Sequence, residues 1–422
     1  MKYSAPRGTC DILPEETPIW QAVERTCRRL FAIYNYKEIR TPVFEATELF
    51  SRSIGETTDI VSKEMYTFTD RKGRSLTLRP EETAPVVRAG LENNLISKDQ
   101  ITKLYYFGPM FRYERPQAGR QRQFHQAGVE VFGSDDPLID VEVIVLAEQI
   151  FNRLGLLDLE VDLNSVGCGQ CRPEFIKKLK AYFKGDIKKM CEECQKRLEA
   201  NPLRILDCKE GPCQNYIEKA PAAMDTICPD CKGHFKAVLA GIESVGLKYK
   251  INNRLVRGLD YYTRTTFEVV SRQLGAQNAV CGGGRYDTLV EELGGKPTPA
   301  MGFAIGLERL IKVLEAQKPD TASRKKRLSL YIATLGEEAR GVGFDILDKL
   351  RRAGISADMD FIGKSLKAQM KAADREGARQ VLIIGEDELR SGKAILRNMR
   401  TASQEEIACD ARIIVEKLQP LT

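Results

Sequence analysis

The sequence predicts a mixed α+β protein, in which an antiparallel sheet flanked by helices is followed by a smaller α/β domain. Two β-rich runs, 103–113 and 124–132, are joined by a polar, basic loop and are typical of an antiparallel strand pair. Residues 328–385 alternate strand and helix patterns, which indicates a separate α/β domain. Between these regions, eight of the 12 cysteines fall within residues 168–231, which indicates a small inserted segment.

Length and composition favour an ordinary globular protein with several domains. The 422 residues exceed the roughly 250–300 at which one hydrophobic core stops growing, so two or three domains are expected. No run of about 18 apolar residues and no apolar leader is present, so we expect a cytoplasmic protein without a membrane partner. A net charge of +6, from 65 basic and 59 acidic residues, permits nucleic-acid binding without indicating it.

The first predicted element is an amphipathic helix, with Thr17 as its N-cap and Pro18 at its first position. Apolar residues then recur at spacings of three and four: Ile19, Trp20, Val23, Cys27, Leu30, Phe31 and Tyr34. On the second strand of the pair, residues two apart share a face, so Gln126, Gly128 and Glu130 point the same way. A polar face with a glycine gap suits a small polar ligand, but a solvent-exposed sheet face fits this spacing equally well.

The domain boundaries are expected where composition changes. Residues 1–167 and 249–320 should form the main domain, and 168–248 a cysteine-rich insertion within it. The basic run 323–327 predicts a linker to the C-terminal domain, 328–422. Within that domain the patterns predict strands at 328–333, 355–361 and 380–385 and helices at 337–352 and 364–376.

Common catalytic motifs are missing from the sequence. There is no GxxxxGK[ST] phosphate loop, and the GGGRYD run at 282–287 does not fit GxGxxG after a strand. Only two histidines, His125 and His234, are present, which argues against a triad or a HExxH zinc site. Arg112, at the other strand of the pair, could hold a phosphate with its forked guanidinium, although a surface salt bridge would explain it as well.

Several stretches resemble the signature motifs of class II aminoacyl-tRNA synthetases. FRYERPQAGRQRQFHQAGVE at 111–130 resembles the second motif in its histidyl form, and PAMGFAIGLERL at 299–310 resembles the third. The helix and strand through Pro42 resemble the first motif, which builds a dimer interface in this family. LVRGLDYYT at 255–263 and GGGRYDTLV at 282–290 resemble stretches that separate histidyl-tRNA synthetases from other class II members.

This resemblance implies a two-step reaction. ATP would activate L-histidine as an adenylate with release of pyrophosphate, and tRNA(His) would then accept the histidine with release of AMP. Arg112 and Arg257 would hold the α-phosphate as the catalytic cations, and Arg309 would hold the distal phosphates together with Mg²⁺. The resemblance also implies a homodimer and an anticodon-binding role for the C-terminal α/β domain.

The resemblance further assigns a histidine-binding site. The amino group would be held by Glu81, Thr83 and Gln126, while Glu130 and Tyr262 would read the imidazole, with Tyr261 beside them. A carboxylate accepts hydrogen bonds and a tyrosine hydroxyl can donate or accept, so Glu130 and Tyr262 can address both ring nitrogens.

Two further residues bear on this site. Tyr286 is a candidate for closing over the ligand, although a packed core tyrosine is an equal alternative. Glu82 departs from the family motif by adding an anion next to Glu81, and its side chain is expected to point away.

The clustered cysteines predict one or two structural Zn²⁺ ions, because paired CxxC knuckles supply the four thiolates of a tetrahedral site. The candidate ligands are Cys168, Cys171, Cys191, Cys194, Cys208, Cys213, Cys228 and Cys231. The alternative is a set of thiols that pack without metal. His234, three residues after Cys231, could replace one cysteine ligand. The other four cysteines are expected to be structural: Cys10, Cys27, Cys281 and Cys409.

Three rival functions fit the sequence less well. A noncatalytic regulatory paralogue of ATP-phosphoribosyltransferase is disfavoured by Arg112, Arg257 and the C-terminal domain. A class II synthetase for another amino acid is disfavoured by Glu130 and the Tyr261–Tyr262 pair. An RNA-binding zinc protein would not need three phosphate-directed arginines.

Overall fold

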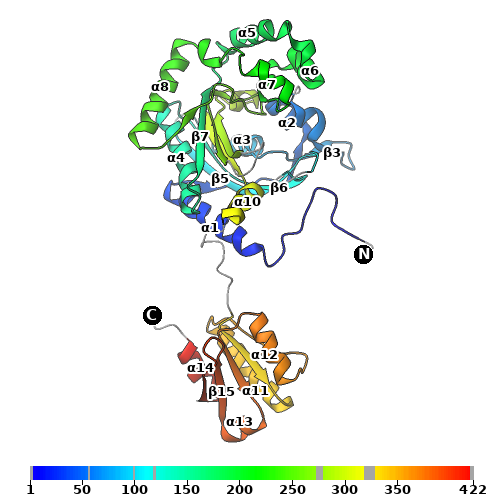
Figure 1. The fold of residues 1–422 in the computed structure, drawn as a ribbon, viewed down its shortest axis with the longest axis vertical. Coiled ribbons are helices and arrows are strands. Elements are labelled where there is room, and N and C mark those ends of the chain that lie inside the picture. The colour runs from blue at the N-terminus through cyan, green and yellow to red at the C-terminus, as the bar shows by residue number, and fades with distance from the viewer. Residues whose placement is uncertain are drawn as a thin grey trace. The chain divides into compact units, whose positions relative to one another are not determined.

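The computed structural model describes residues 3–55, 58–97, 100–116, 120–271, 279–317 and 328–418. The chain divides into two compact units, residues 1–323 and 324–422 (Figure 1). The predicted linker at 323–327 lies outside the described residues.

An eight-stranded sheet, counted over the described residues, organises the first unit in the order β1-β5-β6-β11-β10-β9-β7-β8. Its central pairings are antiparallel, and only the edge strands β1 and β8 pair in parallel. The strands are β1 (Lys37–Glu38), β5 (Thr102–Phe111), β6 (Gln123–Phe132), β7 (Leu159–Ser165), β8 (Lys250–Ile251), β9 (Thr263–Ser271), β10 (Ala279–Arg285) and β11 (Ala300–Gly306). The predicted antiparallel sheet and its β5–β6 pair are confirmed.

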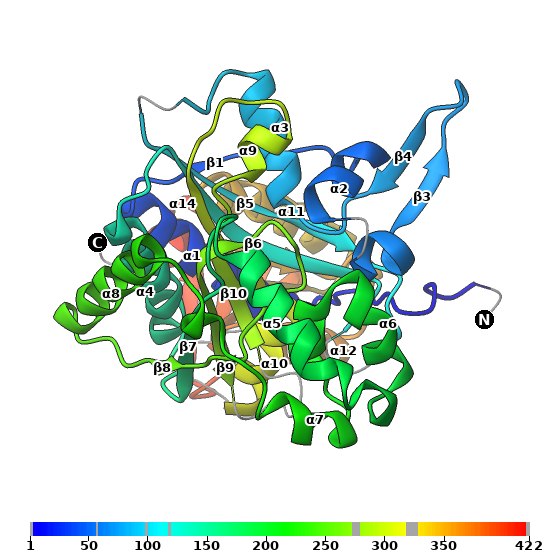
Figure 2. The same ribbon diagram turned by 90° about the horizontal axis from the view of Figure 1, so that it is seen from above.

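One face of this sheet is covered by the helices α1 (Thr17–Ile33), α4 (Pro137–Arg153), α8 (Pro229–Ser244) and α10 (Leu307–Gln317) (Figure 2). Alternate residues of β6, namely Ala127, Val129 and Val131, enter the core beneath them. The prediction for α1 was wrong by one residue, because the helix begins at Thr17 with Glu16 at the N-cap and no side-chain capping bond. The predicted apolar stripe is confirmed, since its i, i+4 residues lie in the same core.

The opposite face of the sheet is left partly open and carries shorter elements. A three-stranded sheet of β2 (Phe44–Ala46), β4 (Ser75–Leu78) and β3 (Tyr66–Thr69) stands beside it with α2 (Thr47–Ile54). The same side of the sheet also carries α3 (Thr83–Glu92) and α9 (Leu289–Glu292). Val86 and Val87 of α3 pack in one core with Tyr106. These elements surround the open part of the face.

The helices of the cysteine-rich segment contribute to two different hydrophobic cores. Its helices α5 (Arg172–Lys184), α6 (Glu192–Ala200) and α7 (Gly211–Ile217) share a small core of their own, with Phe175, Leu179 and Ile205 among its residues. In contrast, α8 lies along α4 and places Phe235 and Val238 in the core of the large sheet. The segment is therefore anchored to the sheet through α8.

The second unit is a five-stranded sheet, over the described residues, in the order β13-β12-β14-β15-β16. Its strands are β12 (Leu330–Thr334), β13 (Ala357–Met359), β14 (Gln380–Ile384), β15 (Lys393–Asn398) and β16 (Gln404–Ala408). Its helices are α11 (Glu337–Arg352), α12 (Leu366–Arg375), α13 (Glu386–Ser391) and α14 (Ala411–Leu418). The predicted βαβαβ order is confirmed for β12 to β14, which pair in parallel, whereas the antiparallel strands β15 and β16 were not predicted.

Candidate active site

Three adjacent strands give the open face of the large sheet a floor of small residues. Glu130 of β6 is opposite Gly302 of β11, and Gly128 is opposite Ala304. Ala304 is in turn opposite Gly282 of β10. The alternation along β6 therefore directs its polar side chains to this face, as the spacing predicted.

Two of these glycines are required by the side chains above them. A methyl group at Gly302 would overlap the carboxyl group of Glu130, and one at Gly282 would overlap the guanidinium of Arg257. The absence of a side chain at both positions lets these two groups approach the sheet closely.

Glu130 is held in a dry, hydrogen-bonded position. Its side chain accepts a hydrogen bond from the Thr83 hydroxyl at 2.8 Å and another from the Tyr286 hydroxyl, and the residue is 1% exposed. Burial raises the pKa of Glu130 to about 8, although both hydrogen bonds favour its ionised form. Tyr286 thus belongs to the wall of the site and contacts Glu130 directly.

Glu81 lies at the start of α3 and accepts the backbone N–H groups of Thr83 at 2.7 Å and Ala84 at 2.9 Å. The hydroxyl of Tyr261 lies 3.5 Å from the same carboxylate. Burial raises the pKa of Glu81, while the helix N-terminus favours its anion. The Tyr261 ring lies 4.8 Å, centroid to centroid, from the ring of Tyr262, and the two planes are tilted by 44°.

Glu82 turns away from this group, as expected. Its carboxylate accepts hydrogen bonds from Arg79 at 2.8 Å and from the Thr41 hydroxyl at 2.7 Å. Burial raises the pKa of Glu82 to about 8, and the Arg79 guanidinium opposes that rise. The extra carboxyl therefore pairs with Arg79 and does not line the cavity above Glu130.

All six residues predicted to bind histidine line one small cavity on the floor: Glu81, Thr83, Gln126, Glu130, Tyr261 and Tyr262. Arg112 and Arg257 also line it and, together with Gln126, separate it from a second, more open pocket. The structure thus brings the predicted amino-acid residues and the predicted phosphate residues side by side.

The second pocket is rich in arginine. Arg112 lies directly after β5, and its Nε donates to the Pro80 carbonyl at 2.8 Å. Across the pocket, Arg257 pairs with Glu268 of β9, and its guanidinium lies 5.7 Å from the centre of the Tyr262 ring. Burial alone would lower the pKa of Arg257, but Glu268 and Tyr262 raise it above its ordinary value.

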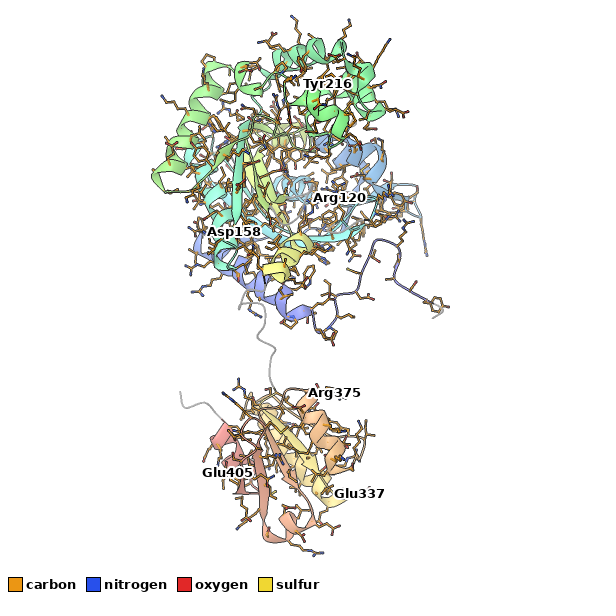
Figure 3. The ribbon with its side chains drawn as sticks, viewed as in Figure 1. Arg120, Asp158, Tyr216, Glu337, Arg375 and Glu405 are labelled. Carbon is orange, nitrogen blue, oxygen red and sulfur yellow. The ribbon has the colours of Figure 1, made fainter. Side chains whose placement is uncertain are left out.

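Arg309, at the start of α10, lines the same pocket and donates to the Ala279 carbonyl at 3.0 Å. Burial, followed by the nearby Arg120, lowers the pKa of Arg309. Arg120 (Figure 3) was present in the quoted second motif but was not singled out from the sequence. The carboxylates of Glu114, Glu268 and Glu308 also line this pocket, and the register that places Glu268 opposite Gly282 could not be read from the sequence.

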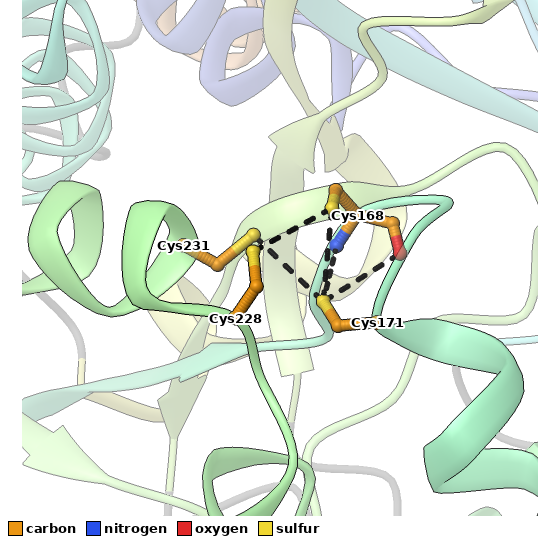
Figure 4. A group of neighbouring side chains, drawn as sticks. All are labelled: Cys168, Cys171, Cys228 and Cys231. Carbon is orange, nitrogen blue, oxygen red and sulfur yellow. Dashed lines mark hydrogen bonds between the residues drawn. The ribbon is translucent and has the colours of Figure 1, made fainter.

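The eight clustered cysteines form two separate groups of four, in each of which the sulfur atoms lie within 4.8 Å of one another. We call the first group A (Cys168, Cys171, Cys228 and Cys231) and the second group B (Cys191, Cys194, Cys208 and Cys213). In group A (Figure 4), Sγ–Sγ distances are 3.7 Å for Cys168–Cys171 and 3.9 Å for both Cys168–Cys228 and Cys171–Cys231. Four sulfurs at about 2.3 Å from a tetrahedral Zn²⁺ would lie about 3.8 Å apart, so the group fits this ion.

Group B has the same character, with a Cys191–Cys208 Sγ distance of 3.8 Å. All eight cysteines are free thiols, as a thiolate site requires. The suggestion that His234 replaces a cysteine ligand was wrong, because its Nε2 lies 2.8 Å from the buried carboxylate of Asp140. That carboxylate also pairs with Arg285 at 2.6 Å, so His234 belongs to a buried ionic network.

Among the described helices, none is both long and apolar enough to cross a membrane.

The antiparallel sheet, its glycine floor and the arginines that line the pocket on its open face together define the catalytic domain of a class II aminoacyl-tRNA synthetase.

Comparison with known proteins identifies the family within this class. Residues 8–310 match the family model described as histidyl-tRNA synthetase, and 329–417 match that of an anticodon binding domain. A histidine–tRNA ligase of Halothermothrix orenii is 53% identical over 421 residues, covering 100% of both chains. Another, of Desulforamulus reducens, is 53% identical over 408 residues, or 97% of each chain. Apo histidyl-tRNA synthetase of S. aureus superposes with a TM-score of 0.82, at 39% identity and 99% coverage of both chains. The chain belongs to the histidyl-tRNA synthetase family.

Proposed function

We propose that this enzyme attaches L-histidine to tRNA(His) in two steps. In the first, a carboxylate oxygen of histidine bonds to the α-phosphorus of ATP while the bond to the bridging oxygen breaks and pyrophosphate leaves. In the second, a ribose hydroxyl of the tRNA end attacks the histidyl carbonyl carbon and loses its proton, and AMP leaves. The observation that carries this proposal is the meeting of the two pockets at Arg112 and Arg257.

The arginines supply the positive charge that the first step needs. Negative charge accumulates around the α-phosphate in the transition state, and preorganised cations at that position lower its energy. Arg112 and Arg257 would face this phosphate from two sides, while Arg309 would hold the distal phosphates. The Nε of Arg257 is buried and makes no hydrogen bond within the described part of the chain, so it has a donor left for the substrate.

The small cavity has the complementary groups for histidine. Gln126 Oε1 is buried and has no hydrogen-bond partner among the described residues, so it can accept a proton of the substrate's ammonium group. Glu81 and Thr83 would hold the same group, while Glu130 and Tyr262 would read the two imidazole nitrogens. A site built on hydrogen bonds rejects analogues that lack them by roughly 10⁴ to 10⁵, so no editing domain is required.

Metal ions have two distinct roles in this proposal. Mg²⁺ would arrive with ATP and be held by its phosphates and by carboxylates that line the second pocket. These are Glu114, Glu268 and Glu308, which contact Arg120, Arg257 and His125 in this structure. Groups A and B would each hold one structural Zn²⁺ through four thiolates. Elemental analysis of protein purified without added metal should find two zinc ions per chain, and a folded, metal-free protein would contradict this assignment.

The remaining proposals follow the family. We infer a homodimer that acts in the cytoplasm, with the C-terminal unit binding the anticodon of tRNA(His). A noncatalytic regulatory subunit is not favoured, because the chain matches its ligase relatives over its full length. Sedimentation velocity tests the dimer. A single monomeric species at micromolar concentration would contradict it.

The test of the activity is exchange of labelled pyrophosphate into ATP with each amino acid in turn. Exchange should require histidine and should be followed by transfer to tRNA(His) when that RNA is added. Exchange that is independent of histidine, or that responds better to another amino acid, would overturn the proposed function.

A further inference from the structure

Group A joins two segments that are distant in sequence. Cys168 and Cys171 precede α5, whereas Cys228 and Cys231 lie at the start of α8. Because α8 is packed in the core of the large sheet, group A fixes the beginning of α5 to that core. The cysteine-rich segment thus leaves and rejoins the catalytic domain at one point.

The residue after Cys171 reaches from this point to the histidine site. Arg172 is the first residue of α5, and its guanidinium donates to the Asp260 carbonyl at 3.0 Å and to the Tyr262 carbonyl. These carbonyls belong to the loop 252–262, which contains no helix or strand and which carries Tyr261 and Tyr262 into the cavity.

A second contact from the insertion secures the same loop. Asn201, between α6 and the turn at Pro202–Asp207, donates from Nδ2 to the Asp260 side chain at 2.8 Å. Val256 of the loop packs against the small core of the insertion. The loop therefore presents its tyrosine rings to the substrate cavity while the insertion holds its backbone.

We propose that Zn²⁺ bound by group A positions the loop 252–262 through Arg172 and thereby sets the affinity for histidine. This inference rests on the proposed histidine activation and on the proposed zinc. Four thiolates around one ion fix the backbone of Cys171, and so fix the origin of the Arg172 side chain. A shift of about 1 Å in Tyr262 would spoil its hydrogen bond to the imidazole, because catalytic and binding geometries tolerate little displacement.

The first experiment compares Arg172→Gln with a matched control, Lys180→Gln, in histidine-dependent pyrophosphate exchange. Lys180 lies on α5, as Arg172 does, and donates to the Glu199 carbonyl at 3.2 Å and to the Glu199 carboxylate at 3.0 Å, so both of these contacts stay within the insertion. We expect Arg172→Gln to raise KM for histidine by about tenfold or more and to leave KM for ATP within about twofold. Arg172→Lys should restore part of the histidine affinity, and Lys180→Gln should keep it within about twofold.

The second experiment joins the metal to the arginine. Cys228→Ser should lower the zinc content by one ion per chain and should raise KM for histidine as Arg172→Gln does. The double variant should be no worse than the more affected single variant, because both changes act through one contact. Thermal unfolding of each variant reports whether the chain remains folded, and KM values are compared only among folded variants.

The outcomes separate the proposals. An unchanged KM for histidine in Arg172→Gln, with exchange still dependent on histidine, overturns the positioning role alone. Loss of zinc from Cys228→Ser without any change in KM overturns the link between metal and loop. Wild-type exchange that does not depend on histidine instead overturns the proposed function itself.

Discussion

Replacing Glu130 with glutamine keeps the shape of the cavity proposed for histidine and removes one of its buried ionisable groups. The carboxylate is 1% exposed, accepts the Thr83 hydroxyl at 2.8 Å and is also bonded by Tyr286. Burial raises its pKa to about 8, so the empty site holds a proton on Glu130 at neutral pH. The variant should therefore change both the stability of the protein and its recognition of histidine.

The effect on stability has a definite sign. Between the ordinary pKa of 4.5 and the folded value of about 8, the folded chain keeps a proton that the unfolded chain has released. The contribution of Glu130 to the free energy of unfolding therefore falls as pH rises through this window, by at most about 5 kcal/mol. Glutamine does not titrate, so Glu130→Gln should become progressively more stable than wild type between pH 5 and pH 8.5.

Although the substitution should make the protein more stable, it should weaken the binding of histidine. An amide cannot offer the charged acceptor that strengthens a hydrogen bond to the imidazole, and such bonds contribute about 1.5–3 kcal/mol. KM for histidine should accordingly rise by about 10- to 100-fold at pH 7, with KM for ATP within about twofold.

Denaturant unfolding at pH 5, 7 and 8.5, together with histidine-dependent pyrophosphate exchange, measures both effects. Glu82→Gln is the matched control, because Glu82 has a pKa raised to about 8 but points away from the cavity toward Arg79. It should alter the pH dependence of stability without altering KM for histidine. If the free energy of unfolding of Glu130→Gln changes with pH as that of wild type does, the carboxyl of Glu130 titrates normally in wild type and the reasoning from burial fails. An unchanged KM for histidine would show that Glu130 does not contact the imidazole ring.

Three further substitutions test other parts of the site. Arg257→Lys should preserve the melting temperature but reduce pyrophosphate exchange by about 100-fold at saturating histidine, since a point charge cannot replace the fork; near-normal exchange would exclude Arg257 as the catalytic cation. Gly302→Ala forces the Glu130 carboxylate away from the sheet, so it should destabilise the chain by about 1–3 kcal/mol and weaken histidine binding. Calorimetry can measure both effects, and full histidine affinity would mean that the carboxylate has room to move. Asp140→Ala leaves Arg285 buried without its main partner and should lower the free energy of unfolding by about 3–5 kcal/mol in urea, whereas a change below 1 kcal/mol would show that water reaches the arginine.

The side of a strand on which a residue lies is predictable from sequence, but its neighbour across the sheet is not. The two-residue period of β6 correctly directs Gln126 and Glu130 to one face. The pairing of Glu130 with Gly302 joins residues distant in the chain, and no local pattern specifies that register. The glycine floor was therefore visible only in the structure.

The cysteines show the same limit. Local spacing identifies the CxxC pairs, but the way in which pairs combine depends on the fold. The structure combines the outermost pairs in group A and encloses group B between them. His234 was misassigned for the same reason, since its partner Asp140 lies on α4, 94 residues earlier in the chain.

The empty cavity disfavours the ionised form of the carboxyl groups that it buries. Glu81 and Glu130 are buried within one cavity, and burial raises the pKa of both. The arginines that line the same cavity, Arg112 and Arg257, also line the second pocket, where phosphate would engage them. The ammonium group and ring N–H of histidine would supply positive charge and donors inside the cavity, so binding of the substrate would favour the ionised form of these carboxyls. Such a site favours histidine over an uncharged or apolar analogue, because the analogue would not supply the donors that the two buried carboxyls can still accept.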